Sequence, residues 1–260
     1  MIRRSIFRAA LVCSLLPAVA LPPCWGLKSG EHIEVEQQAQ RFGSVKVFFD
    51  NRSLKMVFKS AVNGHHQDLL LISKAPTWGV CIFNNQLKLK YSSSVDGIAD
   101  ESQLDFGHLQ PIMLKPCAER DTVFMRQQAK LLLGKPKDAN VNKGENFLPG
   151  GLNNQSAPVK IEKLEYTLLQ EHIPAGLSHV VQALYNVPKE DRYPLSFVQV
   201  TARGTDKLMT TSSVCKKPGN VVLPAEPNYR TCDNLLEVKY GKQQDSVKDI
   251  GLQLLDGGSR

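Results

Sequence analysis

Cysteines are the residues of this sequence whose type and number most clearly imply chemistry. Six occur in the 260-residue chain, and two of them, Cys13 and Cys24, lie among the first 26 residues. An even four remain, which in an oxidising compartment predicts disulfide bonds. Three pairings are possible, and pairing of sequence neighbours would close the shortest loops, each contributing about 2–4 kcal/mol. The four cysteines expected to form two disulfides are Cys81, Cys117, Cys215 and Cys232.

Histidines and carboxylates do not form the patterns of known catalytic or metal sites. The sequence contains no G-x-S-x-G nucleophile motif, no C-x-x-C pair and no glycine-rich phosphate loop. The adjacent His65 and His66 would project to opposite faces of an extended segment, so they could not easily share a metal ion. We therefore expect no catalytic residue, no metal site and no cofactor.

The first 26 residues have the pattern of an export signal. Arg3, Arg4 and Arg8 come before or border an apolar stretch, residues 9–16, that is too short to span a bilayer. We place the cut after Gly26, so that residues 27–260 form a single exported domain, periplasmic or secreted. No later stretch reaches the roughly 18 uninterrupted apolar residues of a membrane span, and we expect none in the mature chain.

Composition and charge exclude several classes of protein. With 42% hydrophobic and 22% charged residues, the chain is an ordinary globular protein and not a disordered or fibrous one. Of the 32 Lys and Arg, three lie in the signal, which leaves 29 − 25 = +4 for residues 27–260. Because these cations are scattered, they favour a solvated basic face, and no nucleic-acid partner is expected.

The elements that must position any site are mostly strands. Between Ser44 and Ser93, five apolar or alternating segments are separated by turn residues, which predicts an antiparallel meander. In the second half we expect a strand at 159–168, a hairpin of 194–202 with 207–211, and a last strand at 235–240. The five segments of the meander are 45–49, 54–59, 68–73, 78–83 and 86–91.

Helices are expected in two places. Residues 121–133 are good helix formers between a capping Asp121 and Gly134, and residues from Pro174 to about 186 carry apolar side chains at helical spacing. A polar loop or linker is expected at about 135–158, and the tail 245–255 fits either a helix or a strand. This order predicts an α+β fold: a long curved antiparallel sheet, half-barrel-like, with two or three helices packed on one face.

Apolar and aromatic side chains concentrate in the first five strands. They would form either a plain core under the helices or a concave face that is incompletely filled and accepts an apolar ligand. The residues expected to bind such a ligand are Phe48, Met56, Phe58, Leu70, Ile72, Trp78 and Ile82.

Two segments resemble the periplasmic lipoprotein-carrier superfamily of LolA-like and LolB-like proteins. They are residues 72–84 (ISKAPTWGVCIFN) and residues 184–188 (LYNVP), which lead to 194–197 (PLSF). The resemblance implies an open half-barrel, capped by helices, around a cavity that shields acyl chains. Our first hypothesis is therefore an exported, non-enzymatic protein that binds a lipid, a lipidated protein or another hydrophobic ligand. The alternatives are a structural or protein-interaction module of the cell envelope with a filled core, and a hydrolase with an unrecognised site.

Overall fold

The computed structural model describes residues 26–40, 42–62, 65–98, 113–137, 161–202 and 204–241, with the backbone alone given for 60–62 and 65–67. Three of the sequence-based predictions fall wholly or largely outside these ranges. They are the signal at 1–26, of which only Gly26 is described, the linker from residue 138 onward, and the tail 245–255.

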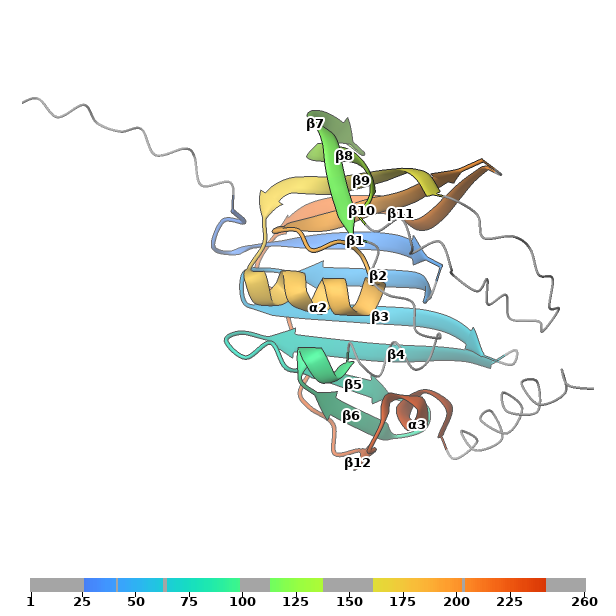
Figure 1. Ribbon diagram of the computed structural model, residues 1–260. Helices are drawn as coiled ribbons and strands as arrows, with labels where there is room; N and C mark the ends of the chain where they lie inside the picture. The colour runs from blue at the N-terminus through green and yellow to red at the C-terminus, as the bar shows by residue number, and fades with distance from the viewer. Residues whose placement is uncertain are drawn as a thin grey trace, which may run out of the picture.

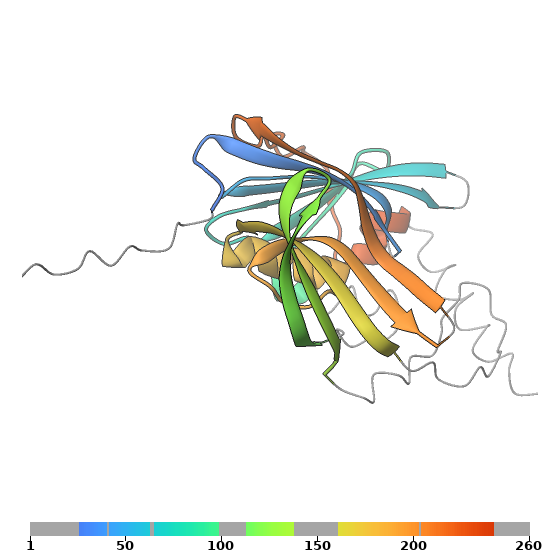
Figure 2. The same cartoon turned by 90° about the horizontal axis from the view of Figure 1, so that it is seen from above.

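Twelve strands form one sheet, in the order β12-β6-β5-β4-β3-β2-β1-β11-β10-β9-β8-β7. Neighbouring strands are antiparallel except for β12 and β6, and the sheet bends into an open curve (Figures 1 and 2). This confirms the predicted α+β fold with its long curved antiparallel sheet. The strands are β1 (Glu31–Ala39), β2 (Gly43–Phe49), β3 (Ser53–Val62), β4 (His65–Lys74), β5 (Val80–Asn84), β6 (Leu89–Ser93), β7 (Leu114–Phe124), β8 (Gln127–Pro136), β9 (Ile161–His172), β10 (Arg192–Thr201), β11 (Gly204–Pro218) and β12 (Arg230–Thr231).

Alternating apolar residues give this sheet a continuous buried face. On β2, for example, every second side chain is buried, at Val45, Val47 and Phe49. Directly paired residues of antiparallel strands point to the same face. Val47 pairs with Met56, and Met56 pairs with Leu71, so the buried face continues from strand to strand. The register thus turns a local period of two into one long apolar surface.

Helix α2 (Ala175–Tyr185) lies across the concave side of the sheet (Figures 1 and 2). It confirms the second predicted helix. Pro174 occupies the N-cap, and Asn186 ends the helix in the left-handed conformation with φ 54°. Leu177, Val180 and Leu184 on its inner side are buried, so α2 contributes its own apolar stripe to the core.

The helix predicted at 121–133 is wrong, because this segment forms the β7–β8 hairpin. Met125 and Arg126 make the turn, with φ angles of 49° and 67°. Strand β8 pairs with β9 from Ala129 to Gly134. Ordinary residues differ by less than about 1 kcal/mol each in helix propensity. Backbone pairing with a strand that is distant in sequence therefore outweighs the local preference.

The strand predicted at 235–240 is also wrong. Residues Leu235–Tyr240 form helix α3, whose N-cap Asn234 accepts a hydrogen bond from the Glu237 backbone N–H at 2.8 Å. Val238 is buried, and its carbonyl accepts a hydrogen bond from the Asn84 side chain on β5 at 3.0 Å. The cap and this contact hold α3 against the end of the sheet.

Residues 219–229, here called the strap, connect β11 to β12 across the convex side of the sheet. The strap begins at the β2–β3 turn, where the Val221 N–H donates to Asp50 Oδ2 at 2.8 Å. Further along, Glu226 pairs with Lys90 at 2.8 Å. Lys90 is paired with Phe83, whereas the neighbouring Ile82 faces the concave side, so this contact lies on the convex face. The strap carries the chain from β11, inside the sheet, to β12 at one edge of it.

The predicted disulfides are absent, and all four cysteines are free. Cys81 lies on β5, the third strand in the sheet order, whereas Cys117 lies on β7, the twelfth. Nine strand spacings separate them, about 43 Å along the sheet, whereas a disulfide requires Cα atoms within about 7 Å. Cys215 on β11 and Cys232 after β12 are separated in the same way, because the strap crosses the sheet between them. Proximity in sequence is therefore not proximity in this fold.

Across the described ranges, none of the helices combines the length and the apolar character needed to cross a membrane.

Candidate functional site on the concave face

The seven residues predicted to bind an apolar ligand divide between the two faces of the sheet. Met56 and Ile82 each pair with Leu71, and Phe58 pairs with Val45, so these side chains belong to the concave rows. All three are buried, as is Trp78 in the β4–β5 connection. The other three predicted residues, half-buried on the opposite convex face, are Phe48, Leu70 and Ile72.

The convex residues therefore do not belong to a site on the concave face. Phe48 is paired with Lys55, and Lys55 with Ile72, so this row mixes apolar and charged side chains. The Lys55 ammonium lies 5.0 Å from the centre of the Phe48 ring. The sequence prediction grouped the two faces because apolar residues occupy both sides of β2 and β4.

The N-terminal turn of α2 packs directly against Trp78. A Cβ atom at Gly176 would lie 2.0 Å from Trp78 Cδ1, so glycine is required for this approach. At the other end of the helix, Tyr185 and Phe58 both pack against Phe42, with ring centroids 6.0 and 5.2 Å from the Phe42 ring. Aromatic contacts therefore hold both ends of α2 against the sheet.

A buried glutamine links α2 to three strands beneath it. Gln37 on β1 is 2% exposed, and its Oε1 accepts hydrogen bonds from Tyr185 Oη of α2 at 3.0 Å and from Tyr193 Oη of β10 at 2.7 Å. Its Nε2 donates to the Pro194 carbonyl at 2.8 Å and to Thr211 Oγ1 at 3.1 Å. We call these residues the Gln37 hub.

The chemistry of the Gln37 hub is structural. Burial raises the pKa of Tyr185 and of Tyr193 well above the usual value, so both hydroxyls remain protonated donors. All the hydrogen-bonding positions of the Gln37 amide are used, so its hydrogen bonds offset the cost of removing the amide from water. The hub fixes the position of the last turn of α2.

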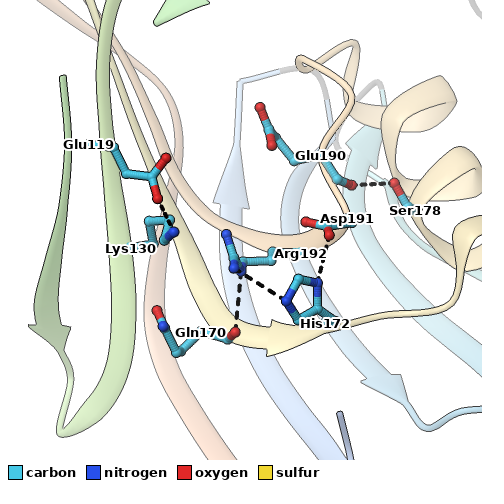
Figure 3. A network of polar contacts seen from close by, with 8 residues as sticks. All are labelled: Glu119, Lys130, Gln170, His172, Ser178, Glu190, Asp191 and Arg192. Carbon is cyan, nitrogen blue, oxygen red and sulfur yellow. Dashed lines mark hydrogen bonds and ion pairs between the residues drawn. The ribbon is translucent and has the colours of Figure 1, made fainter. Parts of the chain in front are cut away.

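A charged cluster lies beside α2 on the same side of the sheet (Figure 3). His172, at the end of β9, is paired with Arg192, at the start of β10. The Arg192 guanidinium can only donate, so His172 Nε2 accepts from it at 3.3 Å and the Nδ1–H donates to Asp191 Oδ2 at 2.6 Å. Arg192 Nε also donates to the Gln170 carbonyl at 3.2 Å. These bonds fix the His172 ring and one edge of the cluster.

Lys130 and Glu190 extend this cluster toward the apolar lining. Lys130 is paired with the buried Leu168, so its side chain lies on the concave face, where it is 15% exposed and pairs with Glu119. Burial is the main cause that raises the pKa of Glu190, and Asp191 raises it further, against the opposing effect of Arg192 and Lys130. The cluster is a polar patch at the border of an apolar surface.

The cluster does not have the geometry of a nucleophile activated by a base. The Ser178 hydroxyl donates to the Glu190 carbonyl, and both ring nitrogens of His172 are occupied by Asp191 and Arg192. Among the described residues, no three or more His, Cys, Asp or Glu side chains are placed to hold a metal ion. What the site can do is bury apolar surface and offer charged groups at its edge.

Sequence reasoning missed the polar part of the site. Gln37 and Lys130 lie at inward positions of strands that we did not predict, since β1 was not recognised and β8 was taken for a helix. The signal available for Gln37 was the alternation of Ile33, Val35, Gln37 and Ala39, in which a polar residue holds a buried position. Nothing in the sequence pairs Asp191 with His172.

Comparisons with known proteins assign no family to the chain. No family model and no curated protein matches it. A solved structure of an uncharacterized conserved protein from Thermus thermophilus matches with 11% sequence identity and a TM-score of 0.37, covering 78% of this chain and 91% of that one.

Proposed function

We propose that this protein is an exported, non-enzymatic binding protein that holds an apolar ligand between helix α2 and the concave face of its sheet. The observation that carries the proposal is the long apolar lining of that face, to which α2 adds its own apolar stripe. Helix α2 spans only part of the width of the sheet. Its 11 residues give a length of about 16 Å, which equals three or four spacings between neighbouring strands. A ligand that replaced α2 on this surface would gain about 25 cal/mol per Å² of buried apolar area.

Binding requires α2 to move, because the lining beneath it is buried. Met56 and Leu71 are fully buried, so a ligand gains access to them only if the helix shifts. The polar side-chain contacts of α2 include a bond from Tyr185 to Gln37, a bond from Ser178 to the Glu190 carbonyl, and an exposed pair of His179 with Asp96 at 3.3 Å. Pro174 and Asn186 mark the two ends where the helix joins its loops. These few contacts suit a helix that serves as a movable cover.

The charged cluster gives the proposed ligand a polar end. Lys130 and Arg192 offer cations beside the apolar lining, and the Glu190 carboxylate lies near both of them. A lipid, or the acyl chain of a lipidated protein, has this combination of a long apolar part and a polar group. The resemblance to lipoprotein carriers points to the same class of ligand.

A second candidate function is an interaction module of the cell envelope with a filled core. The close contact between Gly176 and Trp78 and the complete hydrogen bonding of Gln37 favour it, because both are features of a permanently packed interior. In that case the charged loops would recognise a partner and α2 would never leave the sheet. A hydrolase would need the His172–Asp191 pair to act on a substrate, but Arg192 occupies the free ring nitrogen.

Binding of a dansyl-labelled fatty acid to the full chain tests the proposal. Phe58→Leu on the concave face should weaken binding about fivefold, whereas the matched variant Phe48→Leu on the convex face should leave it unchanged. Native mass spectrometry of the purified protein should show bound lipid, and its mass should place the mature start after Gly26. A lipid-free mass together with no saturable binding of the fatty acid would support the filled-core module instead.

A further inference from the structure

The β7–β8 hairpin, residues 113–137, holds the net positive charge of residues 27–260. It contains six Lys and Arg and two Asp and Glu, a net charge of 6 − 2 = +4. Residues 27–260 as a whole carry 29 − 25 = +4, so the rest of that range is neutral. Lys130 pairs with Glu119, whereas within the described residues the other five hairpin cations form no ion pair: Lys115, Arg120, Arg126, Lys135 and Lys137.

The same hairpin exposes apolar side chains. Of the five large hydrophobic residues that are exposed in the described ranges, three lie on it: Met113 at 40%, Val123 at 64% and Met125 at 43%. Val123 lies near the end of β7 and Met125 is the first residue of the turn, while Phe124 between them packs against the core. Met113 lies at the open end of the hairpin, where its carbonyl accepts from the Lys137 N–H, so the exposed apolar residues of the tip are Val123 and Met125. Neighbouring exposed apolar residues of this kind are candidates for an interaction surface.

The turn at the tip adopts a backbone conformation that its residues disfavour. Met125 and Arg126 both have positive φ, where hairpin turns usually carry glycine or asparagine. Backbone strain of this kind is typically kept where a side chain is needed for function. Here it presents a methionine and an arginine together at the end of the hairpin.

The residues of β7 argue against a protein strand as the partner. β7 is the last strand of the sheet, seen at the upper end in Figure 1, so its outer edge is available. However, Pro116 lacks an N–H, a bulge follows it, and residues 119–121 are all charged. These features disfavour the addition of another strand. The hairpin is suited to a contact made by its side chains.

We propose that the β7–β8 hairpin docks on a membrane surface that contains anionic lipids. Val123 and Met125 would enter the boundary between headgroups and acyl chains, and the arginines would pair with lipid phosphates. The cations without carboxylate partners supply the charge complementarity for such a surface. Of the hairpin, Lys130 and Glu119 belong to the charged cluster of the concave face. The inference does not depend on that site, because it rests on Arg120, Val123, Met125 and Arg126, which are not part of the cluster.

Flotation of the full chain with lipid vesicles tests the proposal. Vesicles of phosphatidylcholine alone are compared with vesicles containing about 30% phosphatidylglycerol, a content that gives a strongly negative surface. Arg120→Gln with Arg126→Gln should lower partition onto the anionic vesicles about fivefold per arginine. Val123→Ser with Met125→Ser should lower it about tenfold per residue.

Matched controls separate the hairpin from a general surface effect. Val222→Ser, at the most exposed apolar residue of the strap, should leave partition unchanged, and so should Lys189→Gln with Lys207→Gln. Circular dichroism and urea midpoints should show that every variant is folded. Equal binding to neutral and anionic vesicles, or hairpin variants that bind like the wild type, would overturn the proposal. Absence of vesicle binding would overturn it too and would leave an acidic protein as the partner of the hairpin.

Discussion

Replacement of Tyr185 by phenylalanine tests whether α2 can move away from the sheet or is permanently packed against it. Tyr185 on α2 and Tyr193 on β10 donate to the same oxygen, Gln37 Oε1, at 3.0 and 2.7 Å. Both side chains are buried. Tyr185→Phe and Tyr193→Phe therefore make the same chemical change at the same acceptor, one on the helix and one on the sheet.

The expected stability changes are similar for the two variants. Each removes one neutral hydrogen bond, which contributes about 1 kcal/mol to the free energy of unfolding. In each case the Gln37 oxygen keeps one tyrosine donor, so no buried acceptor is left without a partner. The phenylalanine ring preserves the apolar packing.

The expected binding changes differ, because only Tyr185 loses its bond to Gln37 when α2 leaves the sheet. Tyr185→Phe therefore favours the displaced state of the helix by about 1 kcal/mol, which raises its population about fivefold. The apparent dissociation constant for a fatty acid that binds only the displaced state should fall by the same factor. Tyr193→Phe breaks a bond that persists in both states, so it should leave this constant unchanged.

The assay is a titration with a dansyl-labelled fatty acid, together with urea denaturation of each variant. Similar urea midpoints show that the two substitutions are matched in stability. The reasoning is refuted if both variants change the dissociation constant equally, or if Tyr185→Phe leaves it at the wild-type value. Either result would mean that α2 stays in place when ligand binds.

Gly176→Ala should lower the free energy of unfolding by about 1–3 kcal/mol, because the added methyl group overlaps Trp78. Alanine is the better helix former by about 1 kcal/mol, which opposes this loss. Urea denaturation measures which of the two effects is larger. Since burial raises the pKa of Glu190, the folded protein binds that proton more tightly than the unfolded chain, and stability falls as the pH rises above the unfolded pKa of 4.5. Glu190→Gln should remove this loss, seen as a higher urea midpoint near about pH 7 than the wild type has, whereas the exposed control Glu162→Gln should not. Because the thiols are free, a reductant should not change the melting temperature, and a drop on reduction would contradict this. A thiol-reactive reagent should modify the exposed Cys117 and Cys215 before Cys81 and Cys232, whose pKa values are raised by burial.

Several elements could be predicted because their signals are local. The hairpin of β10 and β11 follows from alternating residues on both sides of a short polar turn. Helix α2 follows from apolar spacing between two prolines, Pro174 and Pro188. The cap of α3 is also a local signal, since Asn234 precedes Glu237 at N-cap spacing, but the prediction of a strand at 235–240 did not use it.

Other elements depended on contacts that no short window of sequence contains. Residues 127–133 favour a helix by local propensity, and pairing with β9, which lies later in the chain, outweighs that preference. The chain also leaves β11 and crosses the convex face before it forms β12. This crossing separates Cys215 from Cys232, which are neighbours among the cysteines of the sequence. No local feature of the sequence indicated this separation, so the disulfide prediction could not be corrected from the sequence.

The sequence by itself determined that the chain forms a curved antiparallel sheet with a helix on one face, because the periods of two and of 3.6 residues can be read from neighbouring residues. Only the tertiary structure decided which apolar residues share the concave face and which polar groups meet there. Gln37 and Tyr185 are 148 residues apart, and His172 and Asp191 are joined across the α2 connection. Such pairs are set by strand order and register, since these alone bring distant side chains to one face of a sheet.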